Sequence, residues 1–219
     1  MSMGQGLGVL LWMGTVALGL AALAAVLVAR RRRKPRVAGR IALAFGTWLL
    51  AYAAILAAVS LASHERVLAR GETKWFCGVY LDCHMGVAVR GVREAEVVGE
   101  GAAAVRPTGR FRIVTLAVEN SAIRVPLRLY APRAVVTDAA GRSWERSFAA
   151  ERALGGPADL TREVAPGGAY TVELVYDLPE DVADPRLLVS ERVMPDRLAE
   201  LVLIGDEDSL LHAPTTLGI

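Results

Sequence analysis

The stretch "PGGAYTVELVYDLP", Pro166–Pro179, shows most clearly how the larger part of this chain folds. Apolar and polar residues alternate in it, which is the pattern of a β-strand with one buried face. The expected buried face carries Tyr170, Val172, Leu174 and Tyr176. The Pro-Gly-Gly before the alternation and the Leu-Pro after it are turn signals, so the strand is bounded at both ends.

Further strands with the same period of two lie on either side. "FRIVTLAV" (111–118) alternates until "ENSA", and "PRAVVTDAAGRSWERSF" (132–148) reads as a strand, a turn over Asp138 to Gly141 and a second strand. "PRLLVSE" (185–191) and "LAELVLI" (198–204) follow. No long amphipathic helix interrupts the series. Short strands with turns at this spacing predict an all-β, antiparallel sandwich over residues 84–204.

Three motifs resemble one family of exported domains. They are G-x-F-x-x-V-x-x-x-V-x-N (109–120), V-x-D-x-x-G-R-x-W (136–144) and the stretch 166–179. Together they are similar to immunoglobulin-like extracellular domains of unknown function in bacterial lipoproteins and membrane-anchored proteins, over about Val87–Glu191. The resemblance implies that Asn120 ends a strand, that Asp138 to Gly141 form a hairpin turn, and that the exported domain acts in binding or assembly. It supplies no catalytic residue, and the lipoprotein anchor motif is missing.

The N-terminal part of the chain has a different pattern. Leu7–Ala29 and Ile41–Ala62 are runs of 23 and 22 residues without a charged side chain. Each run exceeds the roughly 20 residues that a helix needs to cross a bilayer core. We therefore expect residues 1–62 to form a transmembrane helix hairpin, with spans at about 7–29 and 41–62. A cleaved signal peptide fits the first run poorly, because the positive block follows it instead of preceding it.

Charge predicts the orientation of this hairpin and its location. The connecting loop, residues 30–40, carries seven Lys/Arg and no acid, which keeps it in the cytoplasm. We expect an inner (cytoplasmic) bacterial membrane protein whose N-terminus and C-terminal domain lie on the periplasmic side. Residues 63–219 hold the other 18 Lys/Arg and all 23 Asp/Glu, a net charge of −5. The basic loop alone makes the chain basic, so no nucleic-acid partner is expected.

Both cysteines lie in "KWFCGVYLDCHMG", residues 74–86. In an oxidising compartment, Cys77 and Cys83 are expected to form a disulfide that braces the junction before the sandwich. The alternative is a metal or redox site formed by Cys77, Cys83, His84 and Met85, whose ligand types suit Cu(I). Covalent haem requires Cys-x-x-Cys-His, and a redox pair favours Cys-x-x-Cys, so the five intervening residues fit neither.

The remaining segments complete the predicted organisation. Residues 63–83 are expected to form a stalk with the cysteine loop, and residues 205–219 an acidic and apolar tail. His64 and His212 belong to no recognised catalytic or metal motif, and no cofactor is expected. We expect a non-enzymatic, membrane-anchored interaction module, an accessory subunit of a larger membrane or envelope complex. Its partners would be the lipid bilayer and other membrane or envelope proteins.

Overall fold

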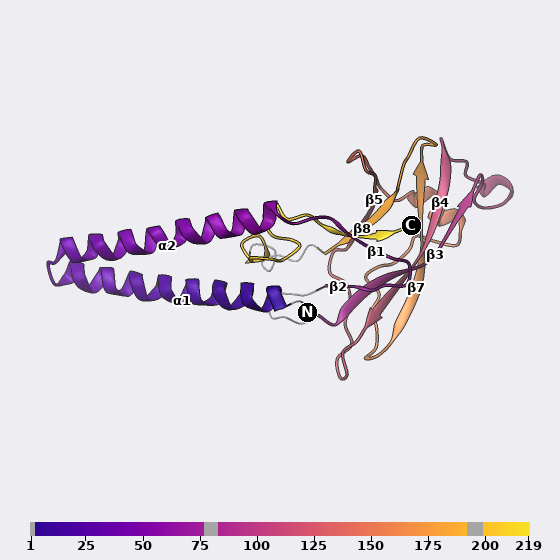
Figure 1. Cartoon of the computed structure of the whole chain (residues 1–219). Coiled ribbons are helices and arrows are strands. Elements are labelled where there is room, and N and C mark those ends of the chain that lie inside the picture. The colour runs from indigo at the N-terminus through magenta and orange to yellow at the C-terminus, as the bar shows by residue number, and fades with distance from the viewer. Residues whose placement is uncertain (1–2, 77–82, 192–198) are drawn as a thin grey trace. The chain divides into compact units, whose positions relative to one another are not determined.

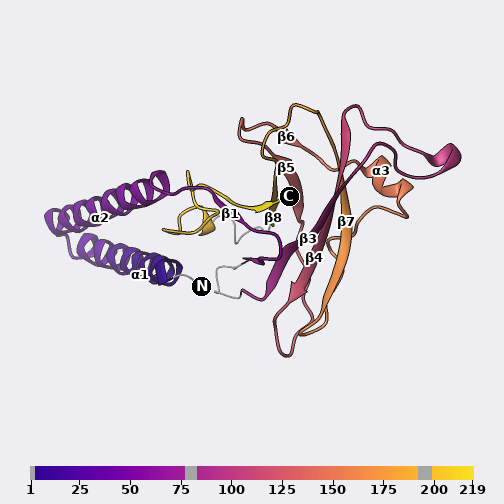
Figure 2. The same ribbon diagram turned by 45° about the vertical axis from the view of Figure 1, so that its right-hand side comes forward.

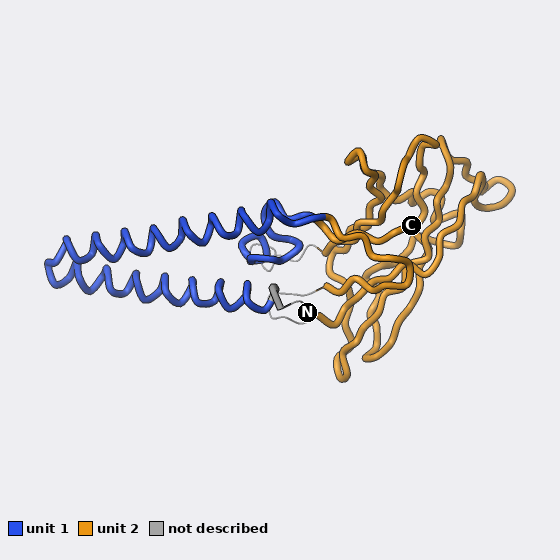
Figure 3. The backbone as a smooth tube through the Cα atoms, in the orientation of Figure 1, with its two compact units in different colours: residues 1–64, 195–213 blue, residues 65–194, 214–219 orange. Residues whose placement is uncertain are grey.

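The computed structural model describes residues 3–76, 83–191 and 199–219. The chain forms two compact units, shown in blue and orange in Figure 3. The first comprises residues 1–64 and 195–213, and the second comprises residues 65–194 and 214–219. The backbone therefore passes between the units three times. These boundaries differ from the expected ones, because the expected stalk and tail both contribute strands to the second unit.

The first unit contains two long antiparallel helices, α1 (Met3–Arg31) and α2 (Pro35–Leu61) (Figure 1). Pro35 occupies the first turn of α2, where its missing N–H costs no hydrogen bond. Trp48 of α2 donates its indole N–H to the Thr15 hydroxyl of α1 over 3.2 Å. Close to this contact the Phe45 ring lies against Gly19, where a Cβ atom would come within 2.9 Å of the ring. The helices thus pack through a small residue and one polar contact.

Most side chains of this helix pair point away from the partner helix. Gly6–Arg31 and Pro35–Leu61 are long and apolar enough to cross a membrane, and only 6% and 11% of their apolar windows are buried. A core helix of a soluble protein would be largely buried instead. The exposed residues are mainly large and aliphatic, including Leu10, Leu20, Leu43, Leu50 and Leu61. Length, composition and exposure all agree with the expected hairpin of apolar spans.

Residues 199–213 pack on this hairpin. The Tyr52 hydroxyl donates to the Val202 carbonyl over 2.6 Å, and the hydroxyl oxygens of Ser60 and Ser209 lie 3.3 Å apart in a buried position. Asp206 accepts a hydrogen bond from the Asp208 N–H, and burial raises the pKa of Asp206 to about 6. The expected strand over 198–204 is wrong in its described part, where residues 199–200 are helical and the following residues form turns. A short apolar run of this kind fits a helical turn as well as a strand.

The second unit is a sandwich of two sheets. One sheet has the order β1-β9-β8-β5-β6. Its strands are β1 (Arg66–Leu68), β9 (Thr215–Gly218), β8 (Arg186–Ser190), β5 (Arg133–Thr137) and β6 (Ser143–Trp144). β1 and β9 are parallel, with Arg66 opposite Thr215, and the other pairs are antiparallel. One parallel pair therefore departs from the purely antiparallel sandwich that was expected.

The other sheet has the order β2-β3-β4-β7 and is antiparallel throughout. Its strands are β2 (Lys74–Phe76), β3 (Met85–Ala95), β4 (Arg110–Asn120) and β7 (Ala169–Leu178). A short 3-10 helix, η1 (Gly101–Ala103), lies in the β3–β4 connection. Figure 2 shows the two layers, with β5 and β8 in one and β3, β4 and β7 in the other.

Apolar side chains from both sheets form one core. On β7 the buried residues Leu174, Tyr176 and Leu178 alternate along the strand, as the sequence pattern predicted. β4 contributes Val114, Leu116 and Val118 in the same way. The Tyr176 hydroxyl donates to the Ala134 carbonyl of β5 over 3.2 Å, which links the two sheets within the core. The β-sandwich expected from the sequence is thereby confirmed.

One short helix was not anticipated. The second strand expected within 143–148 ends at Trp144, and α3 (Phe148–Ala153) follows. Ser147 is the N-cap and accepts a hydrogen bond from the Ala150 N–H. On the outer face of the four-stranded sheet, Ala150 belongs to a second, smaller core with Val98, Phe111, Ile113 and Val175. The Ser cap before an alanine-rich run was the sequence signal for this helix.

Two tyrosines of β7 give a matched test of the core. Tyr176→Phe should lower the free energy of unfolding by about 1 kcal/mol, because the buried Ala134 carbonyl loses its donor. The Tyr170 hydroxyl is buried without a hydrogen-bond partner among the described residues, and burial raises its pKa to about 12. Tyr170→Phe should therefore be neutral or stabilising. Thermal unfolding of the full chain in detergent compares the two, and an equal loss in both variants would contradict this account.

Candidate interaction surface

The structure separates two residues of the predicted metal or redox site, His84 and Met85. Met85 begins β3, and its side chain belongs to the buried core between the sheets. His84 is exposed, and its Nδ1 lies 3.2 Å from the Ser121 hydroxyl. Adjacent residues on a strand point to opposite faces, which explains this divergence. His84 and Met85 therefore do not converge on one ion.

Only one of the two cysteines, Cys83, belongs to the described residues. Cys77 lies outside the described residues, so the Cys77–Cys83 disulfide stays a prediction. Cys83 is partly buried directly before His84. No group of three His, Cys, Asp or Glu side chains that could hold a metal ion occurs among the described residues. The junction itself is well packed, because the Trp75 ring lies against Gly86, where a Cβ atom would come within 2.7 Å of the ring.

Charged side chains on the sandwich are largely engaged with each other. Glu94 accepts from Arg110 and Arg112 over 2.8 and 2.7 Å, and these hydrogen bonds lower its pKa. The three residues line a surface pocket of about 300 Å³ beside Pro179. The Glu94 carboxylate lies between the two guanidinium groups, and Glu180 in the same lining supplies a second negative charge. This arrangement is typical of a structural ion-pair cluster on a sheet surface.

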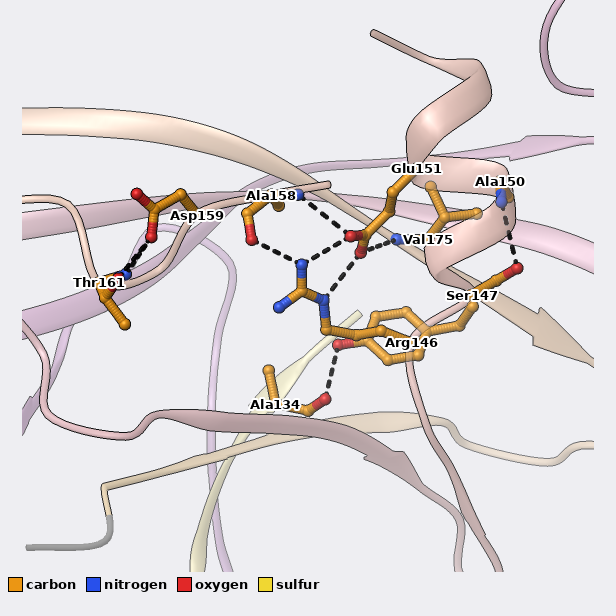
Figure 4. Close-up of polar contacts among 10 residues, drawn as sticks. Ala134, Arg146, Ser147, Ala150, Glu151, Ala158, Asp159, Thr161 and Val175 are labelled. Carbon is orange, nitrogen blue, oxygen red and sulfur yellow. Dashed lines mark hydrogen bonds and ion pairs between the residues drawn. The ribbon is translucent and has the colours of Figure 1, made fainter. Parts of the chain in front are cut away.

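A buried ion pair fixes α3 against β7 (Figure 4). Arg146 donates to both carboxylate oxygens of Glu151 over 2.8 and 2.6 Å, and to the Ala158 carbonyl over 2.7 Å. The fully buried Glu151 also accepts from the N–H groups of Ala158 and Val175. The carboxylate therefore has four donors, which compensate its burial. The Arg146–Glu151 ion pair therefore holds α3 on β7, the edge strand of the sheet.

This brace, the Arg146–Glu151 ion pair together with α3, covers only the C-terminal half of β7. β7 is an edge strand, and the Val175 N–H donates to Glu151 while its C=O accepts from the Ser147 N–H. Val175 thus directs its backbone groups away from β4. Because the direction alternates along a strand, Thr171 and Glu173 also direct their N–H and C=O groups outward. Nothing in the described part of the chain forms a hydrogen bond with these four groups.

The uncovered half of β7 leaves four backbone groups without a hydrogen bond to any described residue. Unpaired backbone groups on a long edge strand form a template for another chain, and proteins usually cover or shorten such edges. Here the only charged side chain over 169–173 is Glu173, which pairs with Arg93 at 3.2 Å. The edge therefore presents alternating donors and acceptors at the spacing that an added strand needs.

The β4–β5 loop, residues 121–132, forms a second exposed feature. Ile123, Val125 and Tyr130 have 90%, 55% and 52% of their surface exposed, and Arg124 and Arg128 are exposed beside them. The Arg128 guanidinium lies 5.5 Å from the centre of the Tyr130 ring. Large apolar side chains gathered in this way are common at contact surfaces.

The backbone of this loop is held in place by hydrogen bonds. The buried Asn120 amide donates to the carbonyls of Val125 and Val164, and its oxygen accepts from the Ala122 N–H. Farther along, Leu127 pairs with Val164 in an isolated bridge, and Leu129 is buried in the core. The exposure of the neighbouring side chains is therefore built into the fold. The expectation that Asn120 ends a strand is confirmed, and its side chain organises the first half of the loop.

Comparisons with known proteins add structural likenesses only. No family model and no curated protein matches the chain. A conserved hypothetical protein from Bacillus anthracis has 18% identity and a TM-score of 0.43, over 57% of this chain and 90% of its own. The secreted protein MPT63 from Mycobacterium tuberculosis has 12% identity and a TM-score of 0.42, over 62% and 95%. An uncharacterized β-sandwich protein from Clostridium difficile 630 has 10% and 0.40, over 72% and 95%. These scores are low, so the fold assignment rests on the strand pairing of this chain.

The cysteine junction can be tested by substitution. Replacing Cys77 and Cys83 with Ser should lower the free energy of unfolding by about 2 kcal/mol and leave the sandwich folded, because a disulfide around so short a loop restricts few conformations. His84→Ala should change stability little, since its contact with Ser121 is exposed. Thermal unfolding and metal analysis of the purified chain measure both effects. If the chain bound one copper ion and the His84→Ala variant bound none, the purely structural role of the cysteine junction would be contradicted.

Proposed function

We propose that this protein is a non-enzymatic, membrane-anchored interaction module that recruits an extended strand of another envelope or membrane protein. The open half of β7 carries the proposal, because Thr171 and Glu173 direct four backbone groups to the edge of the sheet. Strand addition uses main-chain hydrogen bonds for affinity and alternate side chains for specificity. The long edge and the neighbouring brace at Glu151 define where the added strand would begin and end.

Anchoring completes the proposed role. In this proposal α1 and α2 cross the bacterial cytoplasmic membrane, residues 30–40 remain in the cytoplasm, and the N-terminus and the sandwich lie outside. The seven positive charges of the connecting loop support this orientation. We also assign the sandwich to the immunoglobulin-like class of exported domains, on the motifs at Gly109–Asn120, Val136–Trp144 and Pro166–Pro179. An accessory subunit of a larger complex would use both the helices and the sandwich for contacts.

Topology can be measured with introduced cysteines. In a Cys77→Ser, Cys83→Ser background, an impermeant maleimide should label Ala140→Cys in spheroplasts, because position 140 is an exposed turn residue of the sandwich. Arg32→Cys, in the basic loop, should react only after the membrane is permeabilised. Labelling of both positions only after permeabilisation would place the sandwich in the cytoplasm and contradict the proposed orientation.

Strand addition can be tested at a single backbone N–H. Thr171→Pro removes an outward N–H and places a ring at the edge, while the pairing of β7 with β4 keeps its hydrogen bonds. Recovery of cross-linked partners in mild detergent should fall by about tenfold or more, since losing even one main-chain hydrogen bond costs about 1 kcal/mol and the ring blocks others.

Thr171→Ala is the matched control for this variant. It removes the same side chain but keeps the N–H, so partner recovery should be unchanged. Thermal unfolding of both variants verifies that the sandwich is intact. Equal recovery with Pro and Ala would rule out the β7 edge as the contact site. A chain that elutes as a monomer in several mild detergents, without cross-links in cells, would contradict the interaction role altogether.

A further inference from the structure

The β4–β5 loop closes one end of the sandwich. It runs from Asn120 in the four-stranded sheet to Arg133 in the five-stranded sheet, so its residues cross from one layer to the other. At its far end the Tyr130 N–H donates to the Glu191 carboxylate, directly after β8, over 2.7 Å. The exposed side chains of Ile123, Val125 and Tyr130 therefore belong to one end of the domain and not to a sheet face.

The strand register shows that the chain enters and leaves the sandwich at this same end. Arg133 lies opposite Ser190, the last residue of β8. Thr215, the first residue of β9, lies opposite Arg66, the first residue of β1. The Lys74 ammonium group contacts the carbonyls of both Val189 and Thr215 at 3.0 Å, which places these two strand ends side by side. All three passages of the backbone to the helical unit thus start from the end that carries the loop.

The covalent link at this end is short. α2 ends at Leu61 and β1 begins at Arg66, so only residues 62–65 separate them. Fully extended, this link spans at most about 18 Å. If the helices cross a membrane, the end of the sandwich with the β4–β5 loop is therefore tethered close to the lipid surface.

The loop also has the charge of a membrane-contacting segment. Many strand arginines are neutralised by nearby carboxylates, as in the pairs Arg93–Glu173, Arg110–Glu94, Arg133–Glu145 and Arg186–Glu65. Arg124 and Arg128 form no ion pair with any residue that the structure describes. They flank exposed aliphatic residues and a tyrosine, which is the composition that binds an interface containing anionic lipid.

We propose that the β4–β5 loop binds the surface of the anchoring membrane. Ile123 and Val125 enter the boundary between headgroups and acyl chains, while Arg124 and Arg128 bind anionic headgroups and Tyr130 lies at the polar boundary. This inference rests on the proposed anchorage by α1 and α2. Its consequence is an orientation of the sandwich fixed by two contacts, the tether and the loop, so that the open edge of β7 faces a defined direction above the lipid.

The test uses the full chain in vesicles of phosphatidylcholine, alone or mixed with phosphatidylglycerol. A nitroxide is attached through an encoded keto amino acid at position 123, 140 or 50, which leaves both cysteines in place. Collisions with oxygen report lipid exposure, and collisions with a nickel complex report water exposure. In the mixed vesicles we expect the label at position 123 to collide mainly with oxygen, as does the label at position 50 on the exposed face of α2. The label at position 140 should collide mainly with the nickel complex, because it remains in water.

A charge variant tests the electrostatic part. Arg124→Gln combined with Arg128→Gln should lower the ratio of lipid-bound to free loop by about 25-fold in mixed vesicles, since each basic residue contributes about fivefold near an anionic surface. In phosphatidylcholine alone the variant should have no effect. An unchanged ratio in the mixed vesicles would overturn the role of the two arginines.

The labels distinguish the possible failures. Position 123 in water with position 50 in lipid would overturn the loop inference and leave the anchorage intact. Positions 123 and 50 both in water would overturn the anchorage and the inference with it. Position 123 in water, together with a photo-crosslinker there that captures a protein in cells, would assign the loop to a protein partner and also overturn lipid binding.

Discussion

The buried ammonium group of Lys74 holds the two sheets of the sandwich together at the end where the chain enters. Lys74 lies on β2 of the four-stranded sheet, is only 5% exposed, and donates to the carbonyls of Val189 on β8 and Thr215 on β9. The Phe76 ring lies 5.5 Å from the same group. Because an ammonium group without acceptors is costly to bury, the three strands must keep this register together. The end of β8 and the start of β9 are thereby held against β2.

The sandwich is asymmetric as a result of how its edges are covered. Toward the C-terminal half of β7, the Arg146–Glu151 pair and α3 cover the edge and bury the small core around Val175. Toward the N-terminal half, Ala169 lies opposite Glu119, beside the point where the β4–β5 loop begins. The open edge and the exposed loop are therefore neighbours. The α3 brace covers the C-terminal half of β7, whereas the N-terminal half and the β4–β5 loop are exposed.

Local patterns predicted those parts of the fold that depend on neighbours in sequence. The alternation in Pro166–Pro179, the turn at Asp138 to Gly141 and the strand end at Asn120 all appear in the structure. β1 and β9 could not be found in this way, because each has only three or four residues and a partner far away in the chain. The helix α3 was missed because Glu151 stabilises it through contacts with Ala158 and Val175. The exposed loop has no pattern of its own, since burial by distant strands decides which of its side chains face solvent.

The pairing of β1 with β9 has a consequence for how the protein is made. Thr216 of β9 donates to Glu65, 151 residues earlier in the chain, and β1 has no other strand neighbour among the described residues. During synthesis β1 therefore stays unpaired until residues 215–218 have been translated. Contacts of such long sequence separation form slowly and leave unpaired strand edges that are prone to aggregation. A chain whose synthesis stops before this point lacks β9, so β1 has no strand to pair with and one edge of β8 stays open.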